Sequence, residues 1–398
     1  MSPVLNRERA LRLAAEAGID VLVATSAQNV FYLTGYRGFV QHLMPATQVY
    51  GVVRLDDLDR PTLIAPIGDL DTQAQFPARL GELRPYGQFF VEPPCDGARL
   101  DEEQRRLTHI AALEVGASAI DALLDVLRGL PRAARIAVDE TGMAAAARDR
   151  LRTHLGDRWH EGAALLGRIR MVKTEDEIRR LEAAALTIEA SYLAAIEGFE
   201  DGVSEAELAS ILDRRTVEQG SRPAFTVIAF GERSVFPNAV PSRDRRLRRG
   251  DTVRFDIGCL TELYFSDISR TAAFGDPGQR MRERYAAILA GEEQMLTAIR
   301  PGMLARQVFE LAVQATRRAG LPTYRRNHTG HGVGLDTYDP PLLAPGDDTP
   351  LEPGMVLEVE TPYYEIGFGG LQVEDTVLVT ASGCRVLTRT ARDLAVIS

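Results

Sequence analysis

The sequence has little of three things that would define other classes of protein: cysteine, long apolar runs and excess positive charge. Three cysteines in 398 residues are too few for a disulfide framework and are typical of a reducing compartment. Because no run of 18 apolar residues occurs and the N-terminus lacks the apolar core of a signal peptide, we expect no membrane partner. The net charge of −10 argues against a nucleic-acid partner, which would require clustered positive charge. We therefore expect a cytoplasmic protein.

The length and the pattern of apolar residues predict two domains, 1–165 and 166–398. A chain of 398 residues exceeds one ordinary hydrophobic core, and 45% hydrophobic with 26% charged residues is typical of a globular protein. Strand-like and helix-like segments alternate in the first domain, which predicts an α/β fold. In the second domain, Thr174 and Ser204 are each expected to cap the start of a helix, the first over 174–198, with acidic residues in the first turn. These helices and two more, over roughly 278–298 and 304–318, accompany clustered strands with period-two alternation, which predicts an α+β fold.

The second domain contains a predicted β-hairpin with two aspartates that face each other. The hairpin covers residues 252–271, and both of its arms alternate between apolar and polar side chains. A turn centred between Thr261 and Glu262 would place Asp256 directly opposite Asp267, with Cβ atoms about 5 Å apart. Like charges opposed in this way destabilise a sheet unless something neutralises them.

A second predicted hairpin repeats the arrangement with two glutamates. It covers residues 355–378, and a turn centred on Gly367 places Glu360 opposite Glu374. One facing acidic pair could lie by chance on a solvated face, but two such pairs indicate a metal site. Four carboxylates carry a charge of −4, which balances two divalent cations.

A histidine between two glycines, His331, lies between the two hairpins in the sequence. A lone histidine is more often a packed core residue than a ligand, but the glycines on either side allow the backbone to approach closely. One imidazole among carboxylates favours manganese, iron, cobalt or zinc over thiolate-bound metals.

These residues, in this order, resemble the pita-bread metallopeptidase family, which includes methionine aminopeptidase, Xaa-Pro aminopeptidase, prolidase and creatinase. The motifs are Asp-Ile-Gly at 256–258, Ser-Asp-Ile-Ser-Arg-Thr at 266–271, Gly-His-Gly-Val-Gly at 330–334, Val-Glu-Thr-Pro at 359–362 and Val-Glu-Asp-Thr at 373–376. The resemblance covers 166–398 and extends more weakly to Asn29-Val-Phe-Tyr-Leu-Thr-Gly in the first domain. It implies a pita-bread catalytic domain after a creatinase-type N-terminal α/β domain.

The resemblance also implies a dinuclear metal centre. Asp256 would chelate one metal ion, Asp267 and Glu374 would bridge both ions, and His331 and Glu360 would complete the second. Two divalent ions held in this way lower the pKa of a bridging water and polarise the scissile carbonyl. We expect manganese, although cobalt, iron and zinc also suit this ligand set.

The acid–base residues depart from the family pattern. Asn238 and Tyr338 stand where the peptidases carry histidines, and we expect these two residues to be catalytic. The Tyr338 hydroxyl can donate to an oxyanion, although a reference pKa near ~10 makes it a poorer proton shuttle than histidine. We expect His328 and Gln372, which stands in place of an arginine, to bind substrate. His42 is expected to reach the substrate of a partner subunit.

The leading functional prediction is a metal-dependent hydrolase of a peptide or amide C–N bond, with an Xaa-Pro dipeptidase or aminopeptidase first. Two alternatives stay open. The loss of both peptidase histidines favours a non-peptidic small-molecule C–N hydrolase or lyase on the same scaffold. A non-catalytic binding homologue is the other alternative, and the five retained ligands argue against it. The expected partners are a short peptide or small molecule and a second copy of the chain in a homodimer.

Overall fold

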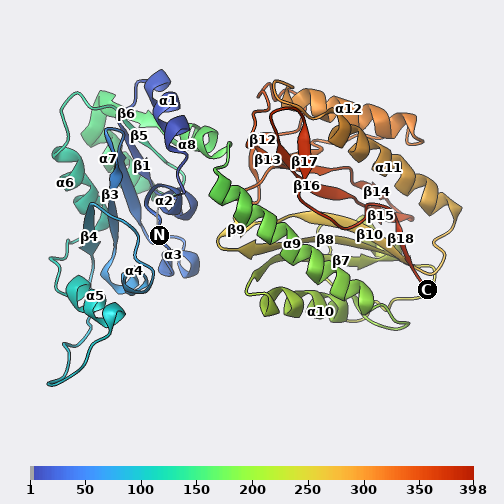
Figure 1. Cartoon of the computed structure of the whole chain (residues 1–398), viewed down its shortest axis with the longest axis horizontal. Coiled ribbons are helices and arrows are strands. Elements are labelled where there is room, and N and C mark those ends of the chain that lie inside the picture. Colours follow the sequence, from blue (N-terminus) through green and yellow to red (C-terminus); the bar gives the residue numbers. More distant parts are fainter. Residues whose placement is uncertain (1–3) are drawn as a thin grey trace. The chain divides into compact units, whose positions relative to one another are not determined.

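The computed structural model describes residues 4–398, apart from the side chain of His42, and divides into two compact units. Unit 1 is Met1–Arg170 and unit 2 is Met171–Ser398 (Figure 1). Within the described residues, no helix is both long enough and apolar enough to cross a membrane.

Unit 1 is a six-stranded mixed sheet with helices, in the order β4-β3-β2-β1-β5-β6. The strands are β1 (Val21–Ala24), β2 (Tyr50–Arg54), β3 (Asp57–Pro66), β4 (Glu82–Tyr86), β5 (Ile136–Val138) and β6 (Trp159–Glu161). The helices are α1 (Arg7–Ala17), α2 (Ala27–Thr34), α3 (Val40–Leu43), α4 (Asp71–Gln75), α5 (Glu102–Ala111), α6 (Ala119–Arg128), α7 (Ala145–Leu155) and α8 (Ala163–Arg170). β1 pairs parallel with β5 and antiparallel with β2, so the sheet is mixed. The predicted α/β class is confirmed.

The core of unit 1 lies between this sheet and helices α6 and α7. Leu123 and Leu127 of α6 and Leu151 of α7 pack with Val23 of β1 and Ile136 of β5, and all five are buried. The apolar residues of α6 recur at helical spacing, so one face of the helix is buried against the strands.

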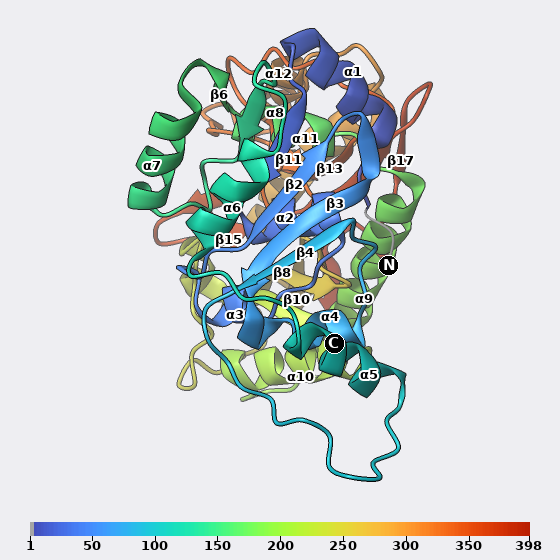
Figure 2. The ribbon, with the colours of Figure 1, turned by 90° about the vertical axis from the view of Figure 1, so that its left-hand side faces the viewer.

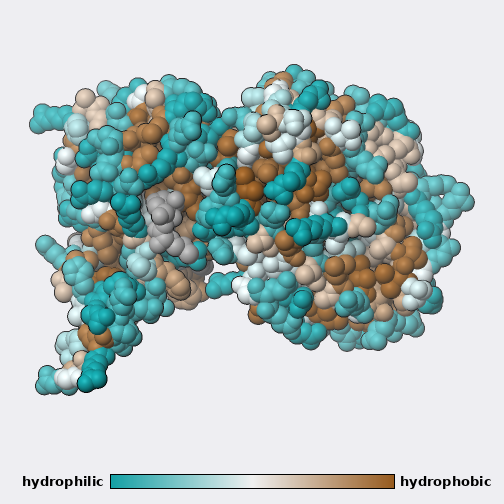
Figure 3. Space-filling view, viewed as in Figure 1, coloured by the Kyte–Doolittle hydropathy of each residue, from teal (hydrophilic) through white to brown (hydrophobic). Residues whose placement is uncertain are grey.

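One segment of unit 1 extends away from its sheet, between β4 and α5 (Figures 1 and 2). It exposes Phe89, Phe90 and Val91, of which Phe90 is 85% exposed. On the face of the molecule drawn in Figure 3, hydrophobic patches are interrupted by hydrophilic side chains.

Unit 2 is built on a ten-stranded sheet whose main path is β12-β11-β13-β16-β10-β8-β7. β9, β17 and β18 pair with β8, β16 and β10 beside this path, and β14 and β15 form a separate ribbon. The strands are β7 (Arg222–Phe230), β8 (Thr252–Thr261), β9 (Tyr264–Phe265), β10 (Ile268–Phe274), β11 (Gly330–Gly332), β12 (Asp339–Leu342), β13 (Val356–Glu360), β14 (Tyr363–Glu365), β15 (Gly369–Leu371), β16 (Glu374–Val379), β17 (Cys384–Val386) and β18 (Ala395–Ile397).

Four helices cover one face of this sheet: α9 (Glu175–Glu197), α10 (Glu205–Glu218), α11 (Gln279–Ala298) and α12 (Ala305–Arg318) (Figure 1). α9 and α10 begin as predicted, because Thr174 and Ser204 each cap a helix and form a capping box with a glutamate three residues later. α9 and α10 pack on β7, β8 and β10, whereas α11 and α12 pack on β13 and β16. The predicted combination of helices with antiparallel strands is confirmed.

Alternation along the strands determines which side chains face the helices. In β8, Val253, Phe255 and Ile257 are buried in the core under α9 and α10. Asp256 therefore points to the opposite face of the sheet. The same alternation in β13 sends Leu357 and Val359 into the core under α11 and α12. Polar side chains of several strands are thus collected on the face that the helices leave open.

Candidate metal centre

Four strands place three acidic residues and one serine in a single row across the open face of the unit 2 sheet. Asp256 of β8 is opposite Ser269 of β10, Ser269 is opposite Glu374 of β16, and Glu374 is opposite Glu360 of β13. The predicted pairing of Glu360 with Glu374 is confirmed. The β14–β15 ribbon continues this hairpin to its turn at Gly367, which has a φ of 80°.

The predicted register of the first hairpin is wrong by two positions. Asp256 lies opposite Ser269 rather than opposite Asp267. The turn is formed by Glu262 and Leu263, which have φ values of 49° and 74°. Neither residue is the glycine or asparagine that usually marks such a turn, so the sequence does not reveal its centre. A shift of two positions keeps Asp267 on the same face of the sheet and makes it a diagonal neighbour of Asp256.

His331 and Asp267 lie beside this row. His331 is opposite Glu358, two residues before Glu360, and Asp267 comes two residues before Ser269. One ligand atom from each of Asp267, His331 and Glu374 lies within 4.8 Å of the other two, and all three residues are buried. His331 Nε2 is 3.8 Å from Asp267 Oδ2. His331 Nδ1 is 3.0 Å from the carbonyl oxygen of Gly332, so an Nδ1–H tautomer leaves Nε2 free to bind a metal.

The glycines beside His331 are required by the packing of β11. A Cβ atom on Gly330 would lie 2.1 Å from the carbonyl oxygen of Glu358, and one on Gly332 would lie 2.4 Å from that of Pro340. Because these contacts are with backbone atoms, a side chain at either position would push neighbouring strands away. The close backbone approach expected from the sequence is therefore present.

Burial and mutual repulsion shape the electrostatics of this cluster. Burial, reinforced by the charge of Asp256, raises the pKa of Asp267 well above its usual value. Burial, reinforced by Asp267, does the same to the pKa of Glu374. Burial raises the pKa of Asp256 to about 6, although Arg254 opposes the effect. For Glu360, burial is outweighed by His328 and His331, which lower its pKa.

The donor set fits a hard or borderline divalent cation. Carboxylate oxygens with one imidazole nitrogen are ligands of manganese, cobalt, iron and zinc. Asp267 Oδ1 is buried and has no hydrogen-bond partner among residues 4–398, and a buried polar atom without a partner is costly. A divalent ion would supply that partner and offset the repulsion between the carboxylates.

Two of the expected substrate-binding residues lie beside Glu360. His328 Nδ1 is 3.1 Å from Glu360 Oε1. Gln372 Nε2 donates to Glu360 Oε2 at 3.2 Å, while Gln372 Oε1 accepts from Arg254 at 2.9 Å and from the Tyr364 hydroxyl at 3.2 Å. Their roles toward a substrate stay predictions.

The expected catalytic residues differ in how the structure places them. The Tyr338 ring stacks on the His331 ring at a centroid distance of 3.7 Å, and 57% of the residue is exposed. Asn238 is exposed in a loop whose carbonyl groups at Phe236 and Pro237 accept hydrogen bonds from Arg254. The side chain of His42 lies outside the described part of the chain.

Three residues of this face were missed in the reading of the sequence. Arg254 is completely buried and donates to Asp256 Oδ2 at 3.2 Å and to the loop of Asn238. Arg326 lies 5.6 Å from the Tyr364 ring centroid. Glu358 is completely buried two positions before Glu360. Arg254 and Glu358 could have been found from the sequence, because each lies two residues before a predicted ligand and therefore on the same face of its strand.

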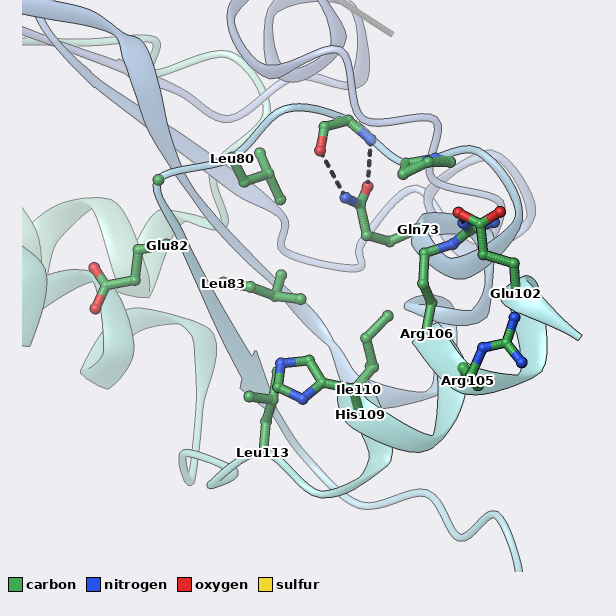
Figure 4. A pocket seen from close by; sticks show the side chains of 13 residues that line it. Gln73, Leu80, Glu82, Leu83, Glu102, Arg105, Arg106, His109, Ile110 and Leu113 are labelled. Carbon is green, nitrogen blue, oxygen red and sulfur yellow. Dashed lines mark hydrogen bonds and ion pairs between the residues drawn. The ribbon is translucent and has the colours of Figure 1, made fainter. Parts of the chain in front are cut away.

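Unit 1 contains a separate cavity of about 560 Å³, lined by residues of α4, β4 and α5 (Figure 4). The Gln73 carboxamide bonds the backbone of Ala78 in both directions, and Arg106 pairs with Glu102 at 2.6 Å. His109 contributes an imidazole to the lining. Among the described residues, no three metal-binding side chains cluster at this cavity, and the group formed by Asp267, His331 and Glu374 lies in unit 2.

An antiparallel sheet that gathers carboxylates from two hairpins around one histidine defines a class of carboxylate-rich metal centres. The sequence profile of metallopeptidase family M24 matches residues 179–381, and that of the creatinase/prolidase N-terminal domain matches residues 7–172. The chain belongs to metallopeptidase family M24, and its fold is the pita-bread fold with a creatinase-type N-terminal domain.

Named relatives support this assignment. The chain is 38% identical to a protein named Xaa-Pro dipeptidase from Pyrococcus furiosus over 228 residues, which are 57% of this chain and 65% of that protein. Among solved structures, dipeptidase PepE from Mycobacterium ulcerans has a TM-score of 0.77 at 26% identity, with 98% of this chain and 96% of that chain covered. Prolidase from P. furiosus has a TM-score of 0.74 at 27% identity, with 96% and 100% covered.

Proposed function

We propose that this protein is a metal-dependent hydrolase that cleaves the C–N bond of short Xaa-Pro peptides. The observation that carries the proposal is the convergence of Asp267, His331 and Glu374 beside the paired Glu360. Two relatives named Xaa-Pro dipeptidase, at 38% and 36% identity, favour a peptide substrate over the non-peptidic alternatives.

In this proposal the metal ligands are Asp256, Asp267, His331, Glu360 and Glu374. Two divalent ions bound there would supply an activated water near neutral pH and polarise the scissile carbonyl. Manganese is the ion we propose, because oxygen ligands dominate the set. The neutral imidazole that ligation requires is consistent with burial, which lowers the pKa of His331.

The remaining residues would bind and orient the peptide. The Tyr338 hydroxyl would donate a hydrogen bond to the developing oxyanion, and the stacking of the Tyr338 ring on His331 supports this role. Asn238 would donate through its amide, on a loop that Arg254 holds. We propose His328 and Gln372 as substrate contacts from the Glu360 side, and His42 as a contact in the partner subunit of a homodimer.

The same proposal assigns residues 1–165 to the creatinase-type domain and residues 166–398 to the catalytic domain of a cytoplasmic enzyme. The two profile matches, to residues 7–172 and 179–381, support a division of the chain into two domains.

The direct test is proline release from a panel of Xaa-Pro dipeptides and tripeptides by manganese-loaded protein. Asp267→Asn is the blank, and Asp348→Asn, which changes an exposed aspartate of unit 2, is the matched control. We expect turnover by the wild type and the control, and at least a hundredfold less by the blank. Absence of turnover from protein that carries two metal ions per chain would contradict the proposal.

A further inference from the structure

The proposed reaction leaves one buried acid of the open face unused. Glu358 lies in β13 between Leu357 and Val359, which face the core, so its side chain points to the same face as Glu360. Its neighbours in the sheet are His331 on β11 and Thr376 on β16. The residue is 0% exposed. Glu358 therefore lies in the second row of the site, beside the histidine.

Glu358, like Asp267, has one carboxylate oxygen that accepts no hydrogen bond within the described chain. Thr376 Oγ1 donates to Glu358 Oε1 at 3.2 Å. Glu358 Oε2 is buried and, like Asp267 Oδ1, has no hydrogen-bond partner within the described chain. A buried carboxylate without full hydrogen bonding is costly, and an apolar or hydroxyl side chain would fill this position at lower cost. Packing alone does not account for a glutamate here.

Asp267 is the proposed metal ligand that lies outside the named strands. It lies between β9 and β10, whereas Glu360, the last residue of β13, and Glu374, the first residue of β16, pair with each other. The Glu358 carboxylate is close enough to Asp267 to contribute to raising the pKa of that carboxyl, after burial and Asp256. The backbone amide of Asp267 in turn favours the charged form of Glu358, although burial outweighs it.

We propose that Glu358 is a positioning residue of the metal centre. It supports the site from the second row, between His331 and Thr376, and adds a fifth carboxylate to the field felt by the ion between Asp267 and His331. Side chains that support metal ligands in this way contribute about 10- to 100-fold to metal affinity. The inference rests on the proposed function only in that the site binds divalent ions.

The test is a calorimetric titration of manganese and cobalt chloride into metal-free, full-length protein. Glu358→Gln removes the charge at nearly constant shape, and Glu310→Gln, an exposed glutamate of α12, is the matched control. We expect Glu358→Gln to weaken the binding of one of the two ions about 10- to 100-fold. The visible absorption spectrum of the cobalt form should also change, while the control behaves as wild type.

Stability of the metal-free protein separates positioning from simple packing. We expect metal-free Glu358→Gln to unfold at or above the wild-type temperature, because one buried carboxylate has been removed. Wild-type affinities with an unchanged cobalt spectrum, or a lower metal-free unfolding temperature with an unchanged spectrum, would overturn the inference. If Glu358→Gln does not fold, Glu358→Thr is measured in the same way against the same outcomes. Since no readout uses peptide turnover, failure of the proposed hydrolase activity would leave this result independent.

Discussion

At the scale of single residues, the main feature is a cluster of buried and half-buried carboxylates whose charges oppose one another. Asp256, Asp267 and Glu374 all have a raised pKa, with burial as the largest cause. A carboxyl group with a raised pKa favours its neutral form, so the metal-free fold holds protons that the unfolded chain would release.

This arrangement predicts how the stability of the metal-free protein depends on pH. Between the unfolded and folded pKa values the folded state binds more protons, so the free energy of unfolding decreases as pH rises. The contribution of these three carboxyl groups to stability should be fully present below their ordinary pKa near 4 and should fall as pH rises through the folded pKa of about 6 at Asp256. Unfolding temperatures between pH 4 and 8, with a chelator and with manganese, test this. We expect the metal to remove most of the decrease, and a metal-free protein that gains stability over this range would contradict the prediction.

The Tyr338 hydroxyl is expected to act as a hydrogen-bond donor in catalysis. Burial, followed by the charges of nearby carboxylates, raises its pKa above the ordinary value near ~10, so the hydroxyl remains protonated at neutral pH. Loss of one oxyanion donor typically costs about 10²-fold in kcat. Steady-state kinetics of Tyr338→Phe should show that loss in kcat with a smaller change in KM.

The pH profile serves as an internal control for Tyr338. The wild type should show no loss of activity from tyrosine ionisation up to about pH 9, because the hydroxyl keeps its proton there. A Tyr338→Phe enzyme within twofold of wild-type kcat would remove this residue from the catalytic assignment.

At the scale of elements, the turn between β8 and β9 is strained. Glu262 and Leu263 both adopt positive φ, a conformation that costs about 1–2 kcal/mol for a residue with a Cβ atom. The turn nevertheless determines the register that brings Asp256 opposite Ser269.

Replacing this turn with Asn-Gly should therefore stabilise the protein. The double change Glu262→Asn and Leu263→Gly is expected to raise the free energy of unfolding by about 1 kcal/mol, measured from urea denaturation midpoints. Leu263→Ala is the control, because it retains a Cβ atom at positive φ and should not stabilise. Equal effects of the two changes would show that the turn is not strained.

Arg254 links two elements at the same face. Its guanidinium donates to Asp256 and Gln372 and to the backbone carbonyls of Ser234, Phe236 and Pro237. One buried side chain thus joins β8, the connection between β15 and β16, where Gln372 lies, and the loop that carries Asn238. A lysine could not make this set of contacts, since it lacks the planar array of five donors.

At the scale of the whole molecule, all five proposed metal ligands belong to unit 2. A metal that binds only the folded form of unit 2 stabilises that unit by an amount that grows with the logarithm of the metal concentration divided by its Kd. We expect scanning calorimetry to show two transitions, of which only the one from unit 2 moves upward with manganese. Asp267→Asn should abolish the shift, and an equal shift of both transitions would contradict the prediction.

The sequence by itself determined the local elements and the composition of the site. Helices begin at Thr174 and Ser204 because a cap and its partner lie three residues apart and need nothing else from the fold. The Glu360–Glu374 pair was predictable because Gly367 marks the centre of its turn. Signals of this kind act over a few residues.

Tertiary structure decided which side chains of different strands contact one another, because those contacts depend on the order of the strands in the sheet. The diagonal relation of Asp256 to Asp267, the stacking of Tyr338 on His331 and the contact of Arg254 with Gln372 all join positions separated by an unmarked turn or by other strands. Alternation tells which face a side chain occupies, but the pairing of strands tells which neighbour it meets there. For this reason the ligand types could be predicted from the sequence, whereas the supporting contacts of Arg254 and Glu358 emerged only when the sheet was assembled.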